Sequence, residues 1–366
     1  MYTGYVKERM WTKRKGQNIA YRRTLSEIRD APLEKMLNHT KLMLTMRKIT
    51  FIIPLIILII LISGCIQQEK KSEIQVKIHD QNISGEIKQD QTWSGEIKVT
   101  GDIEVKEGIT LTILPGTIVK VTAFSDDRHG GTDHPHDPTF PKDPDRIETQ
   151  STQIIIRGIL NAIGTPDKRI IFTSNNEKPT TYDWVGLHVS RGRLEYAIVE
   201  YARYNNFQES SDVVIANNIF RNILECCLCV GHSKPLSPQI LKNDIYNCGH
   251  EGIDYAGGSA LIKGNHFHRE NPEIQPDPSI GGVGVIVYKN AYPIIEDNTF
   301  EKNSNAIIFI SNSMHKEEKG GEVILRNNRI EKNDIGINTD PNYFSNVIIM
   351  ENNQLINNKK DRAYTG

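Results

Sequence analysis

After residue 70, the 366-residue chain lacks any apolar stripe with helical spacing over ten or more residues, which argues against a helical domain there. Positive charge is also scarce beyond the N-terminus. Because 12 of the 44 Lys and Arg and 4 of the 45 Asp and Glu lie in residues 1–64, residues 65–366 carry 32 and 41, a net charge of −9. Such a chain does not attract a phosphate backbone, so we expect no nucleic-acid partner.

The last 150 residues instead repeat one short phrase six times: an Asn, one further residue and a large apolar residue. The repeats start 25, 22, 33, 30 and 25 residues apart, at Asn218, Asn243, Asn265, Asn298, Asn328 and Asn353. Short runs rich in Ile and Val flank them, which is typical of strands joined by tight corners. A period of this length predicts a solenoid. Because Asn tolerates a left-handed backbone and its amide can bond to the next coil, we expect a structural Asn ladder.

These repeats resemble those of the right-handed parallel β-helix proteins of the pectate-lyase-like superfamily, of the surface-lipoprotein type. Seven further stretches are similar to the first coils of such proteins, namely residues 99–105, 108–113, 115–121, 158–165, 170–174, 184–187 and 194–201. The resemblance implies an all-β fold, a single-stranded right-handed parallel β-helix of roughly 10 coils. It implies no single activity, because this fold hosts lyases, hydrolases, epimerases and inert adhesins.

The resemblance and the composition together predict the domain boundaries. The β-helix covers residues 93–358, interrupted by protruding loops at residues 124–150 and 269–282, and residues 359–366 form a C-terminal tail. Residues 66–92 are rich in Gln, Lys, Glu and Asp, and we expect a polar tether there. Residues 1–45 are a basic tail with ten Lys and Arg, unless translation begins at Met43 or Met46.

Residues 46–65 combine a basic start, a short apolar run and small residues before Cys65. This order is typical of a secretory signal with a lipobox-like end. In one interpretation Cys65 is cleaved and lipidated, and in the other the apolar run is an uncleaved membrane anchor. Both place the β-helix outside the cytoplasm and attach it to the membrane.

The loop at residues 124–150 is the first candidate site, because function concentrates on long loops of rigid scaffolds. Its His and Asp residues suit a divalent cation, calcium or zinc, although no regular ligand spacing supports a defined site. His134-x-His136 would share a face only on a strand, which the neighbouring prolines disfavour. The candidate ligands are Asp126, Asp127, His129, Asp133, His134 and His136.

The second candidate lies on an outer sheet face. If Leu228, Ile253, Ile307 and Ile337 point inward, alternation turns their neighbours outward, namely Cys227, Cys229, Gly252, Asp254, Ala306 and Ile308. The preceding turn adds His250 and Glu251. In the enzymes that this chain resembles, substrate lies along such a face, so Asp254, Glu251 and His250 are weak catalytic candidates for proton transfer. The next coils carry no matching carboxylates.

Four cysteines lie in adjacent coils, at Cys226, Cys227, Cys229 and Cys248. Alternation predicts that Cys226 and Cys229 point in opposite directions, which argues against a paired Cys-x-x-Cys motif. We expect buried free thiols or one bridge to Cys248. A metal held by Cys227, Cys229 and His250 is the alternative.

No dense constellation of acids and bases stands out in the sequence. We therefore expect a membrane-anchored surface protein that binds carbohydrate or cell envelope or has a structural role there, without catalysis. The alternative is a polysaccharide lyase, hydrolase or epimerase acting on the outer face. Acids that converge in space would favour the enzyme, whereas scattered Asp and His would favour the binding protein.

Overall fold

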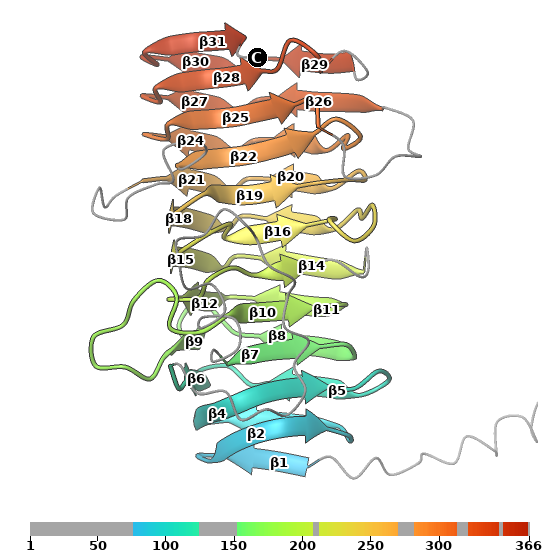
Figure 1. Cartoon of the computed structure of the whole chain (residues 1–366), viewed down its shortest axis with the longest axis vertical. Helices are drawn as coiled ribbons and strands as arrows, with labels where there is room; N and C mark the ends of the chain where they lie inside the picture. Colours follow the sequence, from blue (N-terminus) through green and yellow to red (C-terminus); the bar gives the residue numbers. More distant parts are fainter. Residues whose placement is uncertain are drawn as a thin grey trace, which may run out of the picture. The chain divides into compact units, whose positions relative to one another are not determined.

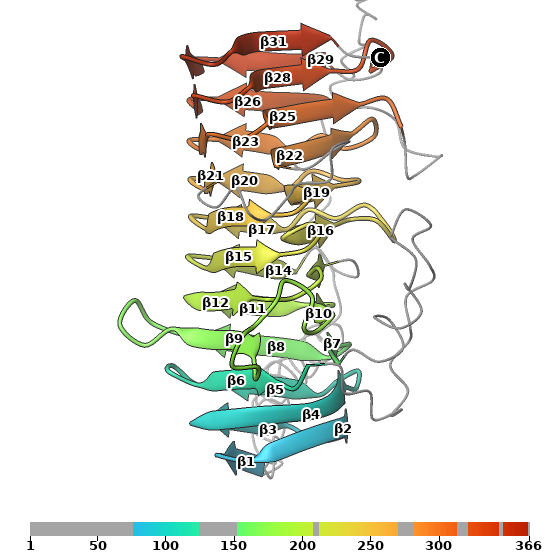
Figure 2. The ribbon, with the colours of Figure 1, turned by 60° about the vertical axis from the view of Figure 1, so that its left-hand side comes forward.

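The computed structural model describes residues 76–123, 152–207, 212–269, 282–312, 321–343 and 347–364. All regular elements in these ranges are β-strands, which stack coil upon coil (Figures 1 and 2). Neighbouring strands pair in parallel, so the parallel β-helix expected from the repeats is confirmed. Within the same ranges there is no helix of the length and apolarity that a membrane crossing requires.

One side of the solenoid is a separate sheet, which we call the first face. Its strands are short because the chain reaches a corner after three to five residues in most coils. They are β1 (Val76–His79), β3 (Gln91–Ser94), β5 (Thr110–Ile113), β8 (Ile159–Ile163), β11 (Gly192–Glu195), β14 (Val213–Ala216), β17 (Gln239–Leu241), β20 (Leu261–Lys263), β23 (Ile294–Glu296), β26 (Glu322–Arg326) and β29 (Val347–Glu351).

The other two sides are joined through β4 (Glu96–Val105), which pairs at its start with β6 and at its end with β7. The second face comprises β6 (Ile118–Val121), β9 (Ile170–Ser174), β12 (Ala197–Glu200), β15 (Ile219–Ile223), β18 (Asp244–Cys248), β21 (His266–His268), β24 (Thr299–Glu301), β27 (Arg329–Glu331) and β30 (Gln354–Ile356). The third face comprises β2 (Asn82–Ile87), β7 (Gln153–Ile156), β10 (Gly186–Val189), β13 (Asn206–Phe207), β16 (Leu228–Val230), β19 (Glu251–Tyr255), β22 (Val283–Tyr288), β25 (Asn305–Ile310), β28 (Ile335–Thr339) and β31 (Lys360–Tyr364).

The solenoid is longer at both ends than the sequence predicts. The segment assigned to a polar tether contains β1, β2 and the first half of β3, and the segment assigned to a C-terminal tail contains β31, which pairs with β28. The polar composition led to the incorrect assignment of a tether because exposed and less exposed side chains alternate along β1 and the first part of β2. A terminal strand with one solvent-exposed face is rich in polar residues and still belongs to the sheet.

The Asn phrase marks the corner between the first and second faces. Asn218, Asn243, Asn265, Asn298, Asn328 and Asn353 form one continuous chain of side-chain hydrogen bonds, with Nδ2 to Oδ1 distances of 2.8–3.1 Å. The Oδ1 atom of each of the last five also accepts the backbone N–H of the Asn in the preceding coil, for example at 2.9 Å between Asn243 and Asn265. The Oδ1 atom of Asn218 accepts the backbone N–H of Ala197 at 2.8 Å. The ladder therefore satisfies buried backbone groups where the strands break.

The left-handed residue at this corner is the one before each ladder Asn, not the Asn itself. Asn217, Lys242, Asp297, Asn327 and Asn352 have φ between 52° and 58°, and Gly264 has φ of 67°. A second ladder, formed by Asn303, Asn333 and Asn358, occupies the corner between the second and third faces. It too follows left-handed residues, Lys302, Lys332 and Asn357. The sequence repeat therefore encodes two corners.

The core is a set of stacked columns, one residue per coil. On the second face, Phe220, Ile245, Phe267 and Phe300 follow one another in register, and the last two rings stack with centroids 4.7 Å apart. A Cβ added at Gly252 would lie 2.8 Å from Phe267, so the large rings exclude a side chain at this corner position. The next two coils carry Gly284 and Ala306 at the position equivalent to Gly252, so this corner column contains only small residues.

Candidate functional site

The third face presents an outward column that passes through Asp254. From His188 the register runs through Asn206, Cys229, Asp254 and Ile286. The predicted inward alignment of Leu228, Ile253, Ile307 and Ile337 is present, with Val285 in an additional coil between them. Asp254 therefore stands on the outer side of a sheet whose inner side is fully packed.

The outward orientation predicted for Cys227, Gly252 and Ala306 is wrong. Cys227 and Ala306 are fully buried in the main core, and a side chain at Gly252 would meet Phe267. These positions lie at or next to the corner between the second and third faces, where the chain bends. Strict alternation holds only along an extended strand, so it cannot be carried across a corner.

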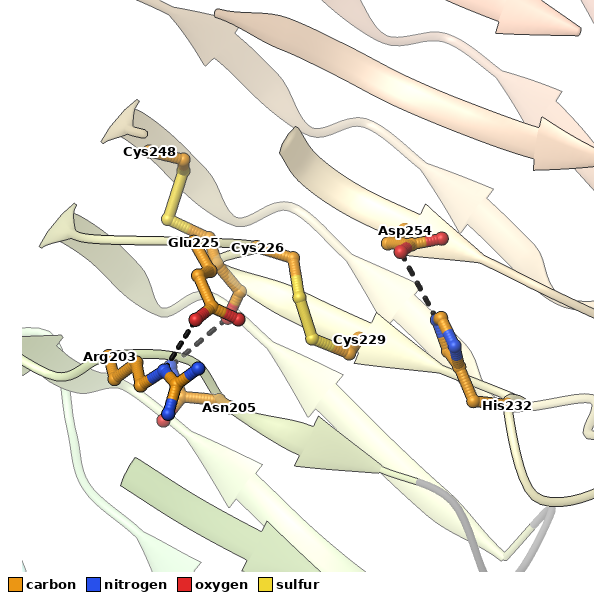
Figure 3. Close-up of a disulfide and its surroundings, with 9 residues drawn as sticks. Arg203, Asn205, Glu225, Cys226, Cys229, His232, Cys248 and Asp254 are labelled. Atoms are coloured by element: carbon orange, nitrogen blue, oxygen red, sulfur yellow. Dashed lines mark hydrogen bonds and ion pairs between the residues drawn. A yellow bond between two sulfur atoms is a disulfide. The ribbon is translucent and has the colours of Figure 1, made fainter. Parts of the chain in front are cut away.

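Two disulfides lie at this corner (Figure 3). Cys227 is bonded to Cys248 in the next coil, which agrees with the expected bridge. Cys226 is bonded to Cys229, so the prediction that these two side chains diverge is wrong. Residues 224–227 bend before β16 begins, and this bend turns Cys226 toward Cys229. With all four thiols oxidised, the alternative metal site at Cys227, Cys229 and His250 is also ruled out in this structure.

Asp254 is paired with an imidazole that the sequence did not single out, that of His232. His232 Nε2 lies 3.2 Å from Asp254 Oδ2, and the two side chains are 20% and 14% exposed (Figure 3). The other carboxylate oxygen, Asp254 Oδ1, is buried and accepts no hydrogen bond from the described residues. Coil spacing would place His232 beside Gly257, and only the loop after β16 turns the ring toward Asp254, so no sequence signal marks the pair.

Glu251 joins this group, whereas His250 does not. Side-chain ligand atoms of Cys226, Glu251 and Asp254 lie within 4.8 Å of one another, and Glu251 is only 3% exposed. His250 lies in the turn before β19, where its backbone N–H donates to the Glu225 carbonyl at 3.3 Å. Of the three residues proposed from sequence, Asp254 and Glu251 therefore lie together in the structure, whereas His250 lies apart. The imidazole beside Asp254 is that of His232 instead.

The electrostatics of the group follow from burial next to carboxylates. Burial lowers the pKa of His232, but the charge of the neighbouring Asp254 carboxylate outweighs burial and leaves the pKa above its ordinary value. Burial raises the pKa of Tyr288, and the charges of Asp254 and Glu251 raise it further. The Tyr288 ring packs edge-on against His232 with centroids 5.9 Å apart. The surroundings of His232 therefore favour its protonated form, while Tyr288 remains neutral.

Below this group, the preceding coil supplies a rigid polar base. Arg203 Nε donates to Glu225 Oε1 at 2.5 Å, and the Arg203 side chain is only 5% exposed. Asn205 Oδ1 accepts the Leu187 backbone N–H at 3.0 Å. Asn205 Nδ2 donates to the Cys227 carbonyl at 3.1 Å (Figure 3). These contacts fix the backbone that carries the disulfides and so position the residues around Asp254.

A basic hollow of about 350 Å³ lies at the ends of third-face strands β4, β7 and β10. Arg157, Arg191 and Lys234 line it together with Glu107. Arg157 is engaged by Glu104 at 2.7 Å. Lys234 belongs to the same loop as His232, so one connection borders both the hollow and the Asp254 group. The acidic net charge of the chain conceals this local cluster of cations.

The second face carries another group that the sequence reasoning missed: Asp244, His266 and His268. The signal was present, because a His-x-His pair on a strand shares one face. That rule was applied to His134-x-His136, which lies outside the described residues, as do Asp126, Asp127, His129, Asp133 and Cys65. Of the predicted loop at 269–282, only the first and last residues fall within the described ranges.

Residues 206–365 match the family model described as a right handed beta helix region. No curated protein matches the chain in sequence. Solved structures similar to it include a mutant of the periplasmic alginate epimerase AlgG, at 13% identity, a TM-score of 0.37, and 77% and 69% coverage of this and that chain. The surface protein and adhesin PfbA of Streptococcus pneumoniae is similar at 15% identity, a TM-score of 0.29, and 79% and 91% coverage.

Proposed function

We propose that this right-handed parallel β-helix protein binds a polysaccharide outside the cytoplasm, on the third face around Asp254. The observation that carries the proposal is the state of the Asp254 carboxylate. One oxygen is paired with His232, and the other is buried without a hydrogen-bond donor among the described residues. A buried acceptor of this kind is costly unless a partner satisfies it, and a sugar hydroxyl is a suitable donor.

The surroundings of Asp254 support a carbohydrate rather than an apolar ligand. Carboxylate and imidazole groups next to the neutral Tyr288 provide acceptors, donors and an aromatic surface, which together suit a polyhydroxylated ring. The rigid sheet beneath them holds the backbone of these groups in place, so only side chains need to move when a ligand reaches Asp254 Oδ1. Such preorganisation lowers the entropic cost of association.

The basic hollow supports an extended, anionic ligand. It borders strands up to β10, and β13 and β16 separate β10 from β19, which carries Asp254. At about 4.8 Å per strand this separation is roughly 14 Å along the solenoid, the length of a few sugar units. A chain lying along the third face could therefore contact Arg191 and Lys234 at one end and Asp254 at the other.

The extracytoplasmic location is inferred from two independent features. Residues 46–65 have the pattern of a secretory signal that ends at Cys65, and the described part of the β-helix contains two disulfides. We propose that lipid on Cys65 anchors the protein to the membrane. A Cys65→Ala variant of the full chain should then leave the membrane fraction, and retention equal to that of the wild type would count against lipidation.

Catalysis on the same polysaccharide is the second candidate, favoured by the convergence of Glu251 and Asp254. Two carboxylates whose ligand atoms lie within 4.8 Å, with an imidazole 3.2 Å from one of them, have the elements of proton transfer. Asp254 would accept a proton and His232 would stabilise the resulting charge distribution. Lyase, epimerase and hydrolase reactions all require a transfer of this kind.

Affinity electrophoresis of the full chain against neutral and acidic polysaccharides, with added calcium, tests the binding proposal. We expect an acidic polysaccharide to retard the wild type, Asp254→Asn to weaken the retardation at least tenfold, and Asp334→Asn, at an exposed position, to leave it unchanged. Failure of every polysaccharide to retard the protein, or equal retardation of Asp254→Asn, would overturn the proposal.

The same samples separate binding from catalysis. Unsaturated products, new reducing ends or a changed uronate composition that disappear in His232→Gln, while retardation persists, would establish an enzyme. Retardation without any product would favour the binding protein. The readouts are ultraviolet absorbance for unsaturated sugars, a reducing-end assay, and proton NMR of the polymer.

A further inference from the structure

We infer that the second face carries a binding site for a first-row divalent metal ion of the zinc type, held by Asp244, His266 and His268. Asp244 Oδ1 lies 3.3 Å from His266 Nδ1 and 2.9 Å from His268 Nε2. One ligand atom from each of the three residues falls within 4.8 Å of the others. A carboxylate and two imidazole nitrogens thus point toward a common centre.

These separations match the requirements of a small metal ion. With bonds of about 2.1 Å, ligand atoms around tetrahedral zinc lie about 3.4 Å apart. The two measured oxygen–nitrogen distances differ from this value by 0.1 and 0.5 Å, so side-chain rotations without backbone movement would complete the site. The imidazole rings stack with centroids 4.1 Å apart, and His266 Nδ1 and His268 Nε2 both lie within 3.3 Å of the same Asp244 oxygen.

The strands hold the three side chains in this arrangement. His266 and His268 are two residues apart on β21, so both point outward while Phe267 between them anchors the strand in the core. Asp244 is directly opposite His266 in the neighbouring strand β18. At the end of β18, Cys248 is bonded to Cys227, which further fixes the strand. The site therefore rests on a rigid scaffold rather than on a loop.

A second carboxylate lies behind one imidazole, as is common for histidine ligands of metals. His266 Nε2 is 3.9 Å from Glu301 Oε2, on the side of the ring away from Nδ1. A carboxylate that accepts the Nε2 proton would leave Nδ1 free to bind the metal and would orient the ring. On the other side of the group, Tyr246 stacks on His268 with centroids 4.7 Å apart and limits its rotation.

The donor set selects the class of metal. Two imidazole nitrogens and one carboxylate oxygen suit zinc, copper or nickel, whereas calcium and magnesium prefer more oxygen ligands. Asp244 and His266 are 42% and 41% exposed, so coordination positions would remain open to water or to an external ligand. The site would resemble an accessible metal centre rather than a closed structural one.

Calorimetric titration of the metal-depleted full chain with zinc tests the inference, with calcium as the contrasting ion. We expect one zinc per chain at this site, a loss of affinity of at least tenfold in His266→Gln and in His268→Gln, and a smaller loss in Glu301→Gln. His79→Gln, at an exposed position on β1, is the matched control and should not change the titration. Cobalt substitution should produce visible absorption bands that the His268→Gln variant lacks.

The loop at residues 124–150 needs its own control, because it also carries histidines. A double variant, His134→Gln with His136→Gln, should keep the cobalt spectrum and the affinity assigned to the second face. If instead this double variant abolishes binding, or if His266→Gln and His268→Gln both leave affinity and spectrum unchanged, the inference is overturned. Circular dichroism melting of each variant confirms that a lost signal does not reflect unfolding.

Discussion

The third and second faces of the solenoid each pair an aspartate with histidine, but the two pairs differ in their access to solvent. Asp254 and His232 are 14% and 20% exposed, and each has the other as its charged partner. Asp244 is 42% exposed and meets two imidazoles at one oxygen. The same residue types therefore form a buried ion pair on one face and an open cluster of ligands on the other.

This difference teaches that the chemistry of an outer face depends on what covers it. A buried carboxylate beside one imidazole stabilises the protonated ring and can exchange a proton with a bound ligand. An exposed carboxylate beside two stacked imidazoles is poised for a cation that needs several ligands at once. The ladder of Asn303, Asn333 and Asn358 lies at the corner between these two faces.

The largest effect is expected from breaking the Asn ladder at the corner between the first and second faces, after which each second-face strand begins. Asn265→Ala removes the acceptor of the Asn243 backbone N–H and the donor to the Ile240 carbonyl, all in the buried ladder. Each buried group left without a partner costs about 1–3 kcal/mol, so we expect a loss of roughly 4 kcal/mol in unfolding free energy. Urea denaturation measures it. Asn353→Ala, at the less buried end of the ladder, is the control and should cost less.

Next in size is the disulfide that lies between the two faces. Replacing Cys227 and Cys248 together by Ala removes a crosslink across 21 residues. The loop-entropy relation gives a loss of about 3 kcal/mol for a loop of this length. The melting temperature of the double variant, compared with that of the oxidised wild type, checks it. A double variant as stable as the oxidised wild type would show that this bond contributes nothing to the fold.

The dependence of the unfolding free energy on pH tests the ion pair of Asp254 and His232 on the third face. Because the pKa of His232 is raised in the folded state, its stabilisation is fully present below the ordinary pKa near 6.5 and is lost as the pH rises through the folded pKa. The unfolding free energy of the wild type should exceed that of His232→Gln by about 2 kcal/mol at pH 5.5, within the range of roughly 1–3 kcal/mol for a buried polar group that loses its partner. The difference should shrink as the pH rises from 5.5 to 9. A constant difference across this range would contradict the ion pair.

The smallest effect is expected at an exposed ion pair beside the open cluster. Lys332 Nζ lies 3.1 Å from Glu301 Oε1, but the Lys332 side chain is 51% exposed. Solvent screening leaves such pairs with less than about 1 kcal/mol, so Lys332→Gln should change the unfolding free energy by no more than about 0.5 kcal/mol. Urea denaturation at low and high salt checks it. If Lys332→Gln lowered the unfolding free energy equally at low and high salt, the pair of Lys332 and Glu301 would be less accessible to solvent than its exposed fraction indicates.

Much of the fold could be predicted because each coil repeats the same physical problem. The ladder residues Asn218 to Asn353 recur with apolar neighbours every 22–33 residues, so the sequence alone indicated strands, corners and stacking. The predictions were wrong at positions where the polarity of neighbouring residues does not indicate which side chains are buried in the folded protein. Strands β1 and β2 resemble a tether in composition, and the residues flanking Leu228 lie next to a corner that interrupts their alternation.

The amino-acid sequence by itself determined the solenoid, its Asn corners, and the presence of Asp254 on an outer face, because period and alternation are properties of neighbouring residues. Only the tertiary structure decided which side chains meet: His232 with Asp254, Cys226 with Cys229, and Asp244 with His266 and His268. These partners lie in a loop, a bend and adjacent coils of unequal length. The distances between these partners depend on the backbone path of each coil, which patterns of neighbouring residues do not determine.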